Sequence, residues 1–246
     1  YGGCLSCVEI LTVLYFGALK VDPLQPAWSE RDRFVLSKGH AGAALYSTLA
    51  ERGHFEKKQL STFGKLDSPF GAHPDMRKVP GVDMSTGSLG HGLPVGVGMA
   101  LASKLKRTNV RVIVLLGDGE VQEGTTWEAA MCSHHYGLHN LIAIVDRNQM
   151  QIDGPTANVT SMEPLADRWK SFGWHVKEVN GHSFHELLRA LDELLHEDRG
   201  PSVIIANTIK GKGVSFMENR WDWHSRRATT EETRQALEEL TQEEDA

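Results

Sequence analysis

The chain has 246 residues, of which 40% are hydrophobic, and a formal net charge of −6. This length and composition suit one α/β domain with a sizeable core, and no apolar run approaches the roughly 20 residues that a membrane span needs. The negative charge argues against a nucleic-acid-binding protein, because phosphate backbones attract basic surfaces. Three cysteines cannot all pair with one another, which is typical of a reducing, cytoplasmic location.

The first part of the chain is predicted to begin with a buried helix. Residues 4–19 are apolar on nearly every side, which indicates burial in the core or against another chain. Cys4 and Cys7 have the spacing of a redox or zinc site, but without a second pair we interpret them as buried helix thiols. A loop, a strand, a helix and a shorter helix follow at residues 22–32, 34–37, 43–52 and 56–64.

A glycine-rich region comes next. The loop over residues 65–81 contains Gly-Ala-His-Pro, and the following turn over residues 85–92 reads STGSLGHG. Further glycines at positions 96 and 98 precede a predicted helix that runs to about residue 106. Glycines at this density allow the backbone to pack closely against a neighbour or a ligand.

The central stretch, residues 110–154, reads as strand, acidic turn, helix, strand and polar turn. Residues 110–116 and 141–145 are short apolar runs typical of strands that are buried on both faces of a parallel sheet. The helix between them is predicted over residues 123–136. Two parallel neighbours would place Asp118 and Asn148 side by side at their carboxyl ends, where open α/β sheets bind ligands.

The remaining elements continue the alternation of strand and helix. The sequence predicts a loop and helix over residues 158–169, a strand over 174–179, a helix over 183–196, a strand over 201–208 and an amphipathic helix over 229–240. Thr229 or Thr230 is the expected N-cap of the last helix. The pattern indicates an α/β fold, a parallel sheet with helices on both faces. We expect one domain over residues 1–246, with a helical extension from about residue 226.

The acidic and polar turns together indicate a metal-bridged diphosphate. A carboxylate, an amide oxygen and exposed backbone carbonyls are hard ligands that suit Mg²⁺ or Ca²⁺. Mg²⁺ in particular takes a few protein oxygens and completes its octahedron with phosphate oxygens and water.

Two segments of this stretch, GDGEVQEGTTWEAA and NLIAIVDRNQMQIDG, resemble transketolase, and GDG with a later Asn resembles the thiamine diphosphate motif. The resemblance implies the diphosphate-binding domain of the thiamine diphosphate-binding fold. It implies that Asp118, Asn148 and the carbonyl of Met150 hold Mg²⁺ or Ca²⁺. It also places the cofactor against Gly117, Gly119 and Glu120.

Three loop histidines match transketolase motifs, although a loop histidine on its own is usually a surface residue. SKGHA, AHPD and WHS contain His40, His73 and His224. The resemblance implies that His40 and His224 contact the diphosphate and the sugar, and that His73 contacts the first hydroxyl groups of the substrate. Imidazoles that titrate near neutral pH suit the proton transfers of ketose cleavage.

Other cofactor contacts follow from the same resemblance. The backbone at Gly87, Ser88 and Leu89 is expected to receive the amino group of the cofactor. Ser88 and His91 depart from the family's TTGPLGQG, which leaves their side-chain roles open. The lysines at positions 210 and 212 follow the last strand, and we expect Lys210 to approach a phosphate.

The resemblance covers residues 2–240, which is less than half of a full transketolase. It implies a split enzyme whose partner subunit carries the pyrimidine-binding domain and the catalytic Glu, with two copies of each chain (α2β2). Glu123 resembles the residue that couples the two cofactor sites across the interface; alternatively it is an exposed Glu at a helix start. The helix over residues 4–19 is a candidate for the interface.

The implied reaction transfers a two-carbon ketol unit from a ketose, phosphorylated in the usual case, to an aldehyde, and needs the partner. Alternatives are the α subunit of a 2-oxoacid dehydrogenase, a deoxyxylulose-type synthase, and a non-catalytic diphosphate-binding module. SKGHA, AHPD and TIKGKG favour the ketose-cleaving branch over the first two.

Overall fold

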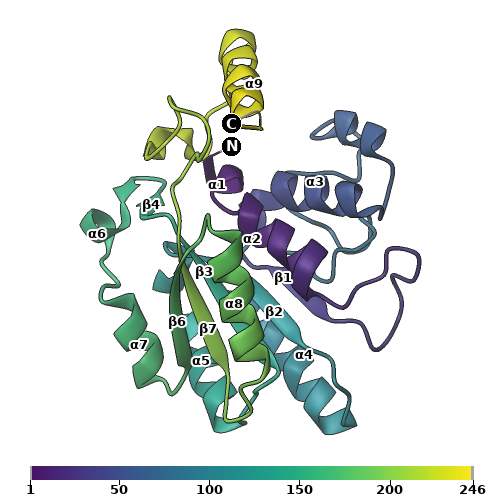
Figure 1. Cartoon of the computed structure of the whole chain (residues 1–246), viewed down its shortest axis with the longest axis vertical. Helices are drawn as coiled ribbons and strands as arrows, with labels where there is room; N and C mark the ends of the chain where they lie inside the picture. Colours follow the sequence, from purple (N-terminus) through teal and green to yellow (C-terminus); the bar gives the residue numbers. More distant parts are fainter. Residues whose placement is uncertain (1, 245–246) are drawn as a thin grey trace.

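The computed structural model, which describes residues 2–244, contains a five-stranded parallel sheet in the order β1-β2-β3-β7-β6 (Figure 1). The strands are β1 (Arg33–Leu36), β2 (Val112–Gly117), β3 (Leu141–Arg147), β7 (Ser202–Asn207) and β6 (His175–Asn180). Each neighbouring pair is parallel. A small antiparallel hairpin, β4 (Met150–Gln151) with β5 (Gly154–Pro155), follows β3. The predicted fold class is therefore confirmed, and all five strands lie within two residues of their predicted positions.

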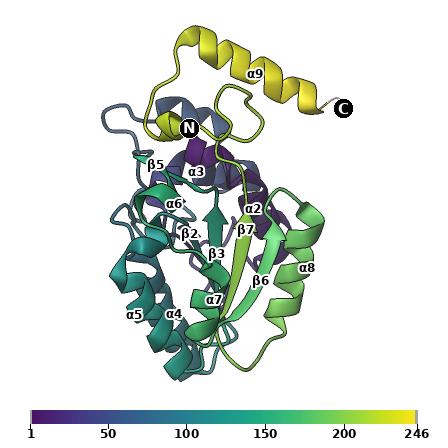
Figure 2. The same cartoon turned by 90° about the vertical axis from the view of Figure 1, so that its left-hand side faces the viewer.

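Helices cover both faces of the sheet, as Figure 2 shows with α8 on one side and α4 and α5 on the other. The helices of the first face are α2 (Val8–Val13), α3 (Gly42–Arg52) and α8 (Phe184–Leu195). Those of the second are α4 (Gly92–Lys106), α5 (Gly124–His135) and α7 (Leu165–Ser171). The shorter helical segments are α1 (Gly2–Leu5), η1 (Leu14–Ala18), η2 (Gly39–Ala41), η3 (Lys57–Thr62), η4 (Glu120–Gln122), α6 (Thr156–Val159) and η5 (Trp221–His224). No helix within residues 2–244 is long and apolar enough to cross a membrane.

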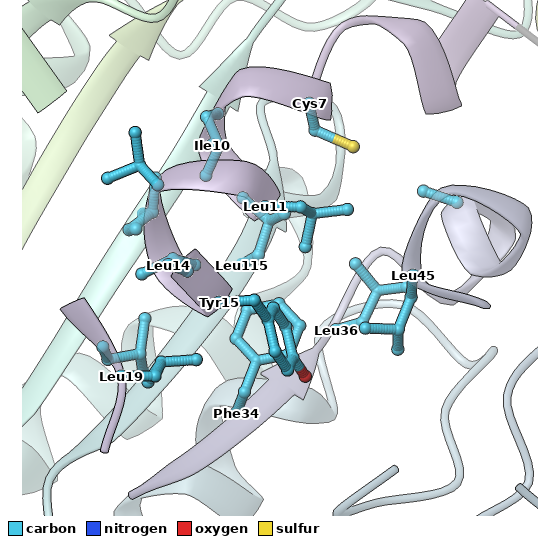
Figure 3. Packing of buried hydrophobic residues seen from close by; sticks show 14 of the residues in the cluster. Cys7, Ile10, Leu11, Leu14, Tyr15, Leu19, Phe34, Leu36, Leu45 and Leu115 are labelled. Atoms are coloured by element: carbon cyan, nitrogen blue, oxygen red, sulfur yellow. The ribbon is translucent and has the colours of Figure 1, made fainter. Parts of the chain in front are cut away.

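Each central strand supplies side chains to two separate cores. Along β2, Ile113 and Leu115 pack into the core under α2, α3 and α8, whereas Val112 and Val114 pack into the core under α4, α5 and α7. Successive strand side chains point to opposite faces, so a strand buried on both sides must be apolar throughout. Figure 3 shows the first of these cores, where Leu115 lies beside Leu11 and Leu14.

The predicted helix over residues 4–19 is broken into three segments. α1 ends at Leu5, α2 begins at Val8, and a π-helical turn follows from Leu14. At the break, the buried Ser6 hydroxyl donates to the Asp146 carboxylate at 2.6 Å, and a side chain drawn to such a partner competes with helical hydrogen bonding. Ile10 and Leu11 are buried in the chain's own core, which decides between the two predicted kinds of burial.

The C-x-x-C thiols lie at this break. Cys7 is fully buried, and burial raises its pKa to about 12, so the thiol stays protonated at neutral pH. Cys4 is half-buried, and both cysteines are free. This environment supports the interpretation of structural thiols over redox chemistry.

Two other elements differ from prediction. The helix that ends near residue 106 begins at Gly92, earlier than expected, so that Gly96 and Gly98 lie inside α4. A Cβ atom at Gly96 would lie 2.5 Å from Cγ2 of Val114, so the glycine serves close contact between helix and sheet rather than a turn. The short helix predicted over residues 56–64 is the 3₁₀-helix η3.

The last helix, α9 (Thr230–Glu244), lies beyond the carboxyl edge of the sheet (Figure 2). Thr229 begins it with a capping box: Glu232 N–H donates to Thr229 Oγ1 at 3.2 Å, and Thr229 N–H donates to Glu232 Oε2 at 2.8 Å. Ala236 and Leu240 attach the helix to a small apolar cluster around Trp223.

Candidate cofactor site at the carboxyl edge of the sheet

Asp118 and Asn148 lie side by side at the carboxyl ends of β2 and β3. The register pairs Gly117 with Asp146, and Asp118 Oδ2 accepts the N–H of Gln149 at 2.6 Å. Parallel pairing brings the two turns together, as the sequence predicts. They open into a cavity of about 210 Å³. The sequence-predicted residues that line it are His40, Leu89, Gly117, Asp118, Gly119, Glu120, Glu123, Asn148, Met150, Lys210 and His224.

Three of the predicted residues lie outside the lining of this cavity. Gly87 packs between Gly39 and His73: a Cβ atom on Gly87 would lie 3.1 Å from Cγ of His73. His73 is exposed, yet it is near enough to His40 to influence its titration. Ser88 is exposed as well. The structure therefore brings the STGSLGHG turn beside the histidine loops, with Leu89 alone of its three predicted contacts in the cavity.

The oxygen donors of the cavity suit a hard divalent cation. Burial, followed by the nearby charge of Asp146, raises the pKa of Asp118 to about 7, so a cation beside it would stabilise its charged form. The Asn148 amide donates through Nδ2 to Asp146 at 3.3 Å and accepts Met150 N–H through Oδ1 at 3.1 Å. Within residues 2–244 no cluster of three His, Cys, Asp or Glu side chains could hold a metal. A cation at this edge therefore needs the mixed carboxylate, amide and backbone donors that are present.

Glu120 joins three loops from inside the cavity wall. Its Oε1 accepts the N–H of Gly90 at 3.0 Å and the hydroxyl of Ser37, while its Oε2 accepts the N–H of Gly117 at 3.0 Å. Burial raises the pKa of Glu120. Because both oxygens are engaged, the geometry gives Glu120 the work of joining the loops that surround the cavity.

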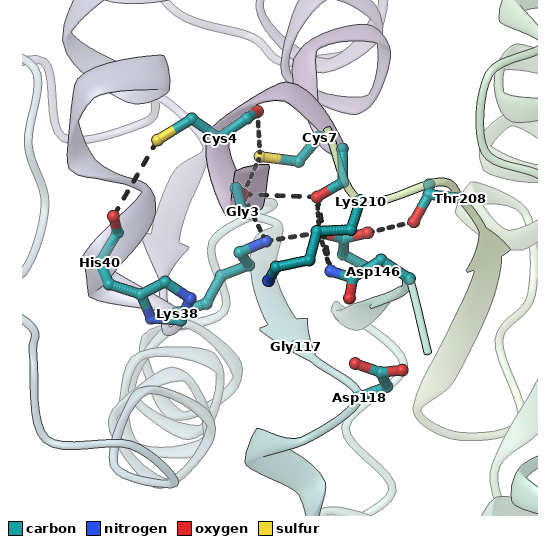
Figure 4. Close-up of polar contacts among 12 residues, drawn as sticks. Gly3, Cys4, Cys7, Lys38, His40, Gly117, Asp118, Asp146, Thr208 and Lys210 are labelled. Atoms are coloured by element: carbon teal, nitrogen blue, oxygen red, sulfur yellow. Dashed lines mark hydrogen bonds and ion pairs between the residues drawn. The ribbon is translucent and has the colours of Figure 1, made fainter. Parts of the chain in front are cut away.

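A buried ion pair that the sequence analysis did not assign lies behind the oxygen donors. Lys38 and Asp146 are 1% and 0% exposed and form a direct ion pair (Figure 4). Lys38 also donates to the Gly3 carbonyl at 2.8 Å, and Asp146 accepts from the hydroxyls of Ser6 and Thr208. Burial opposes both charges, yet each partner holds the other ionised: the pKa of Lys38 is raised and that of Asp146 lowered. The available signal was a charged residue directly after each of two predicted buried strands.

Two histidines and a lysine form the opposite wall. The rings of His40 and His224 lie 4.9 Å apart between centroids, and Lys210 Nζ is 3.0 Å from His224 Nδ1. Burial, together with the charge of Lys38, lowers the pKa of His40 to about 3; burial and Lys210 lower the pKa of His224 to about 4. Burial and the charge of Lys38 also lower the pKa of Lys210 to about 8. At neutral pH this wall presents two neutral imidazoles and one ammonium group.

The remaining sequence candidates lie at the rim. Of the two lysines after β7, Lys210 reaches the cavity, whereas Lys212 pairs with Glu218 at 3.4 Å. Glu123 is exposed, and it lies at the first turn of α5 while also lining the cavity. His91 is exposed, with Nδ1 3.0 Å from the Leu89 carbonyl oxygen.

The neutral histidines predict a loss of stability in acid. Because their pKa values in the folded chain lie below the ordinary 6.5, the unfolded chain binds protons first as the pH falls. We expect the free energy of unfolding of the cofactor-free chain to decrease from about pH 6.5 toward pH 4. Urea unfolding followed by circular dichroism measures it. The double variant His40→Gln/His224→Gln should lose less over this range, and an equal loss in both proteins would contradict the burial of neutral imidazoles.

Comparison with known proteins identifies the domain. The family model "Transketolase, thiamine diphosphate binding domain" matches residues 1–245. An apulose-4-phosphate transketolase subunit of Phocaeicola vulgatus is 44% identical over 98% of this chain and 85% of its own length. A 6-deoxy-6-sulfo-D-fructose transketolase subunit of a Clostridium species is 46% identical over 98% and 88%. The crystal structure of Campylobacter jejuni transketolase superposes with a TM-score of 0.90 and 32% identity, over 96% of this chain and 38% of its own.

The fold and the site are thus those of a thiamine diphosphate binding domain. The chain belongs to the transketolase family, and among its members it corresponds to one of the two chains of split transketolase-like transferases, the one that holds this domain. The sequence-based recognition of a transketolase N-terminal subunit is confirmed. The chain spans 38% of the length of the Campylobacter enzyme.

Proposed function

We propose that the chain is the cofactor-anchoring subunit of a two-chain transketolase, which transfers a two-carbon ketol unit from a ketose to an aldehyde. The observation that carries this proposal is the cavity at the carboxyl edge of β2 and β3. It combines hard oxygen donors, a buried ammonium group and neutral imidazoles in a domain that the family match assigns to thiamine diphosphate. The whole chain would act as one diphosphate-binding domain, with a helical extension from about residue 226.

The residues would divide the work of binding by their chemistry. Asp118, Asn148 and the carbonyl of Met150 would hold Mg²⁺, or Ca²⁺, through hard oxygen atoms. Lys210 would approach the diphosphate as a point charge, and the low pKa caused by its burial would rise beside that anion. The backbone from Gly87 to Leu89 would receive the amino group of the cofactor. Bound thiamine diphosphate supplies the carbanion chemistry, while the protein supplies binding, orientation and charge.

The histidines would act on the sugar. His40 and His224 face each other across the cavity and are neutral at neutral pH, so each can accept or donate a proton at a substrate hydroxyl. His73 lies beside Gly87 at the outer end, where the first hydroxyl groups of a ketose would enter. Their neutral state is the one a general base needs.

The proposed partner is a C-terminal transketolase subunit that carries the pyrimidine-binding domain and a catalytic Glu, in an α2β2 assembly in the cytoplasm. Glu123 supports this placement, because its carboxylate lies exposed at the rim of the cavity rather than buried within it. There it could couple two cofactor sites across a subunit interface. The segment over residues 4–19, mostly buried in its own core, offers Val8 and Phe16 as exposed contacts.

Turnover by the separate and mixed chains tests this function. With Mg²⁺, thiamine diphosphate, a ketose donor and an aldehyde acceptor, we expect ketol transfer from the mixture and negligible transfer from this chain alone. The donors should include apulose 4-phosphate and 6-deoxy-6-sulfo-D-fructose, for which two relatives are named. Robust activity of the single chain would contradict the two-chain proposal. Cofactor binding by the mixture without turnover of any ketose would favour the non-catalytic module.

A further inference from the structure

A polar link between two helical segments lies behind the loop that carries Lys210. His182 follows β6, and its Nε2 accepts the backbone N–H of Ile209 at 2.8 Å. Its Nδ1 lies 2.9 Å from Oε1 of Glu9 on α2. Both side chains are largely buried, at 12% and 19% exposure. The link is outside the cofactor cavity, and no step described above uses it.

The geometry fixes the tautomer of His182. A backbone N–H can only donate, so Nε2 of His182 must present its lone pair to Ile209. The proton of the neutral ring is then on Nδ1, where it donates to the carboxylate of Glu9. Each of the two nitrogens therefore has one defined role, and Glu9 selects the tautomer that Ile209 requires.

Glu9 is a poor choice if stability alone matters. Its second oxygen, Oε2, is buried and has no hydrogen-bond partner among the described residues. A half-satisfied buried carboxylate costs free energy, and each such group in a folded protein calls for an explanation. Local features that lower stability are expected at functional sites. The link therefore requires a role in what Ile209 positions.

Ile209 lies between two residues of the cofactor site. Thr208 donates to Asp146, and Lys210 extends into the cavity to within 3.0 Å of His224 Nδ1. On the far side, the N–H of Gly211 donates to the Gly2 carbonyl at 3.0 Å. The backbone that carries Lys210 is thus held on both sides, and His182 provides the hold at the strand end.

We propose that His182, kept in one tautomer by Glu9, is a positioning residue for Lys210 and so for the anionic end of the cofactor. The assignment rests on the proposed function, in which Lys210 meets the diphosphate. The link to Ile209, however, is a property of the chain itself and can be tested without cofactor.

The tautomer is tested directly by nuclear magnetic resonance. Long-range ¹H–¹⁵N spectra of the cofactor-free chain at neutral pH should show Nε2 of His182 unprotonated and Nδ1 protonated. A protonated Nε2, or two tautomers in exchange, would overturn the proposal whether or not the chain binds thiamine diphosphate.

A matched pair of variants tests the effect on the cofactor. In His182→Gln the side-chain oxygen reaches the position of Nε2 and can accept from Ile209, whereas the shorter Asn of His182→Asn reaches only the position of Nδ1. For the chain mixed with its partner, we expect His182→Asn to weaken binding of thiamine diphosphate with Mg²⁺ about tenfold, the effect of one hydrogen bond. His182→Gln should stay within about threefold of the wild type. His185→Asn, an exposed histidine of α8, is the matched control and should have no effect.

A double-variant cycle separates positioning from general destabilisation, with urea unfolding to verify that every variant is folded. If His182 acts through Lys210, His182→Asn should cost less than about twofold in affinity once Lys210→Met is present. The same tenfold cost in both backgrounds would overturn the proposal, as would a Lys210→Met variant with unchanged affinity. Absence of binding by the wild-type mixture would instead refute the proposed function, and the tautomer experiment would still decide whether the link exists.

Discussion

Asp118→Asn is expected to weaken the binding of thiamine diphosphate with Mg²⁺ by more than about 100-fold, because loss of even an outer partner of a metal ligand costs about 10–100-fold. The variant keeps the size of the side chain and one oxygen that can accept the N–H of Gln149. It removes the negative charge that a divalent cation needs. Calorimetry on the chain mixed with its partner measures the affinity.

The stability of this variant provides a second readout. Burial raises the pKa of Asp118, which shows that its charge is unfavourable in the cofactor-free fold. Asp118→Asn should therefore unfold at the same urea concentration as the wild type or a higher one at pH 8. Asp153→Asn, an exposed acid of the same cavity, is the control and should retain affinity. Wild-type affinity in Asp118→Asn would refute the metal assignment, and a strongly destabilised Asp118→Asn would contradict the described electrostatics.

Lys38→Met is expected to have the largest effect on stability, a decrease of about 3–5 kcal/mol in the free energy of unfolding. It leaves the fully buried carboxylate of Asp146 without its cation, and removal of one partner of a buried ion pair costs about that much. The Gly3 carbonyl also loses a donor. Urea unfolding at pH 7 measures the change.

A surface lysine provides the control for this experiment. Lys177 pairs with Glu193 at 2.5 Å, with both side chains more than 40% exposed, so Lys177→Met should cost less than about 1 kcal/mol. In Lys38→Met/Asp146→Asn the unpaired charge is gone, and at least half of the lost stability should return. An equal loss in the single and double variants would show that the charge of Asp146 is not the cause.

The strands and the central pair of turns could be predicted because their signals are local. An apolar run of the length of β2 or β3 fits a buried strand wherever it pairs, and parallel neighbours must end at one edge. This reasoning alone placed Asp118 beside Asn148, and the structure confirms it. Resemblance to transketolase added the histidines and Lys210, which no periodicity indicates. The structure places His40, His224 and Lys210 in one cavity, while their catalytic and binding roles stay predictions.

What could not be predicted depends on partners that are distant in the sequence. Ser6 interrupts the first helix because its hydroxyl meets Asp146, 140 residues further along the chain. The ion pair of Lys38 with Asp146 spans 108 residues, and the local pattern does not reveal which buried charges will meet. The early start of α4 has the same origin, since Gly96 reads as a turn residue until its contact with Val114 is known.

Calorimetric titration of thiamine diphosphate with Mg²⁺ tests the central claim most directly, on this chain alone and on its mixture with the proposed partner. We expect binding by the mixture that is absent, or much weaker, with the single chain, because the chain supplies the metal and diphosphate contacts but only part of the site. Failure of the cofactor to bind under either condition would contradict the assignment of the cavity at the carboxyl edge of β2 and β3.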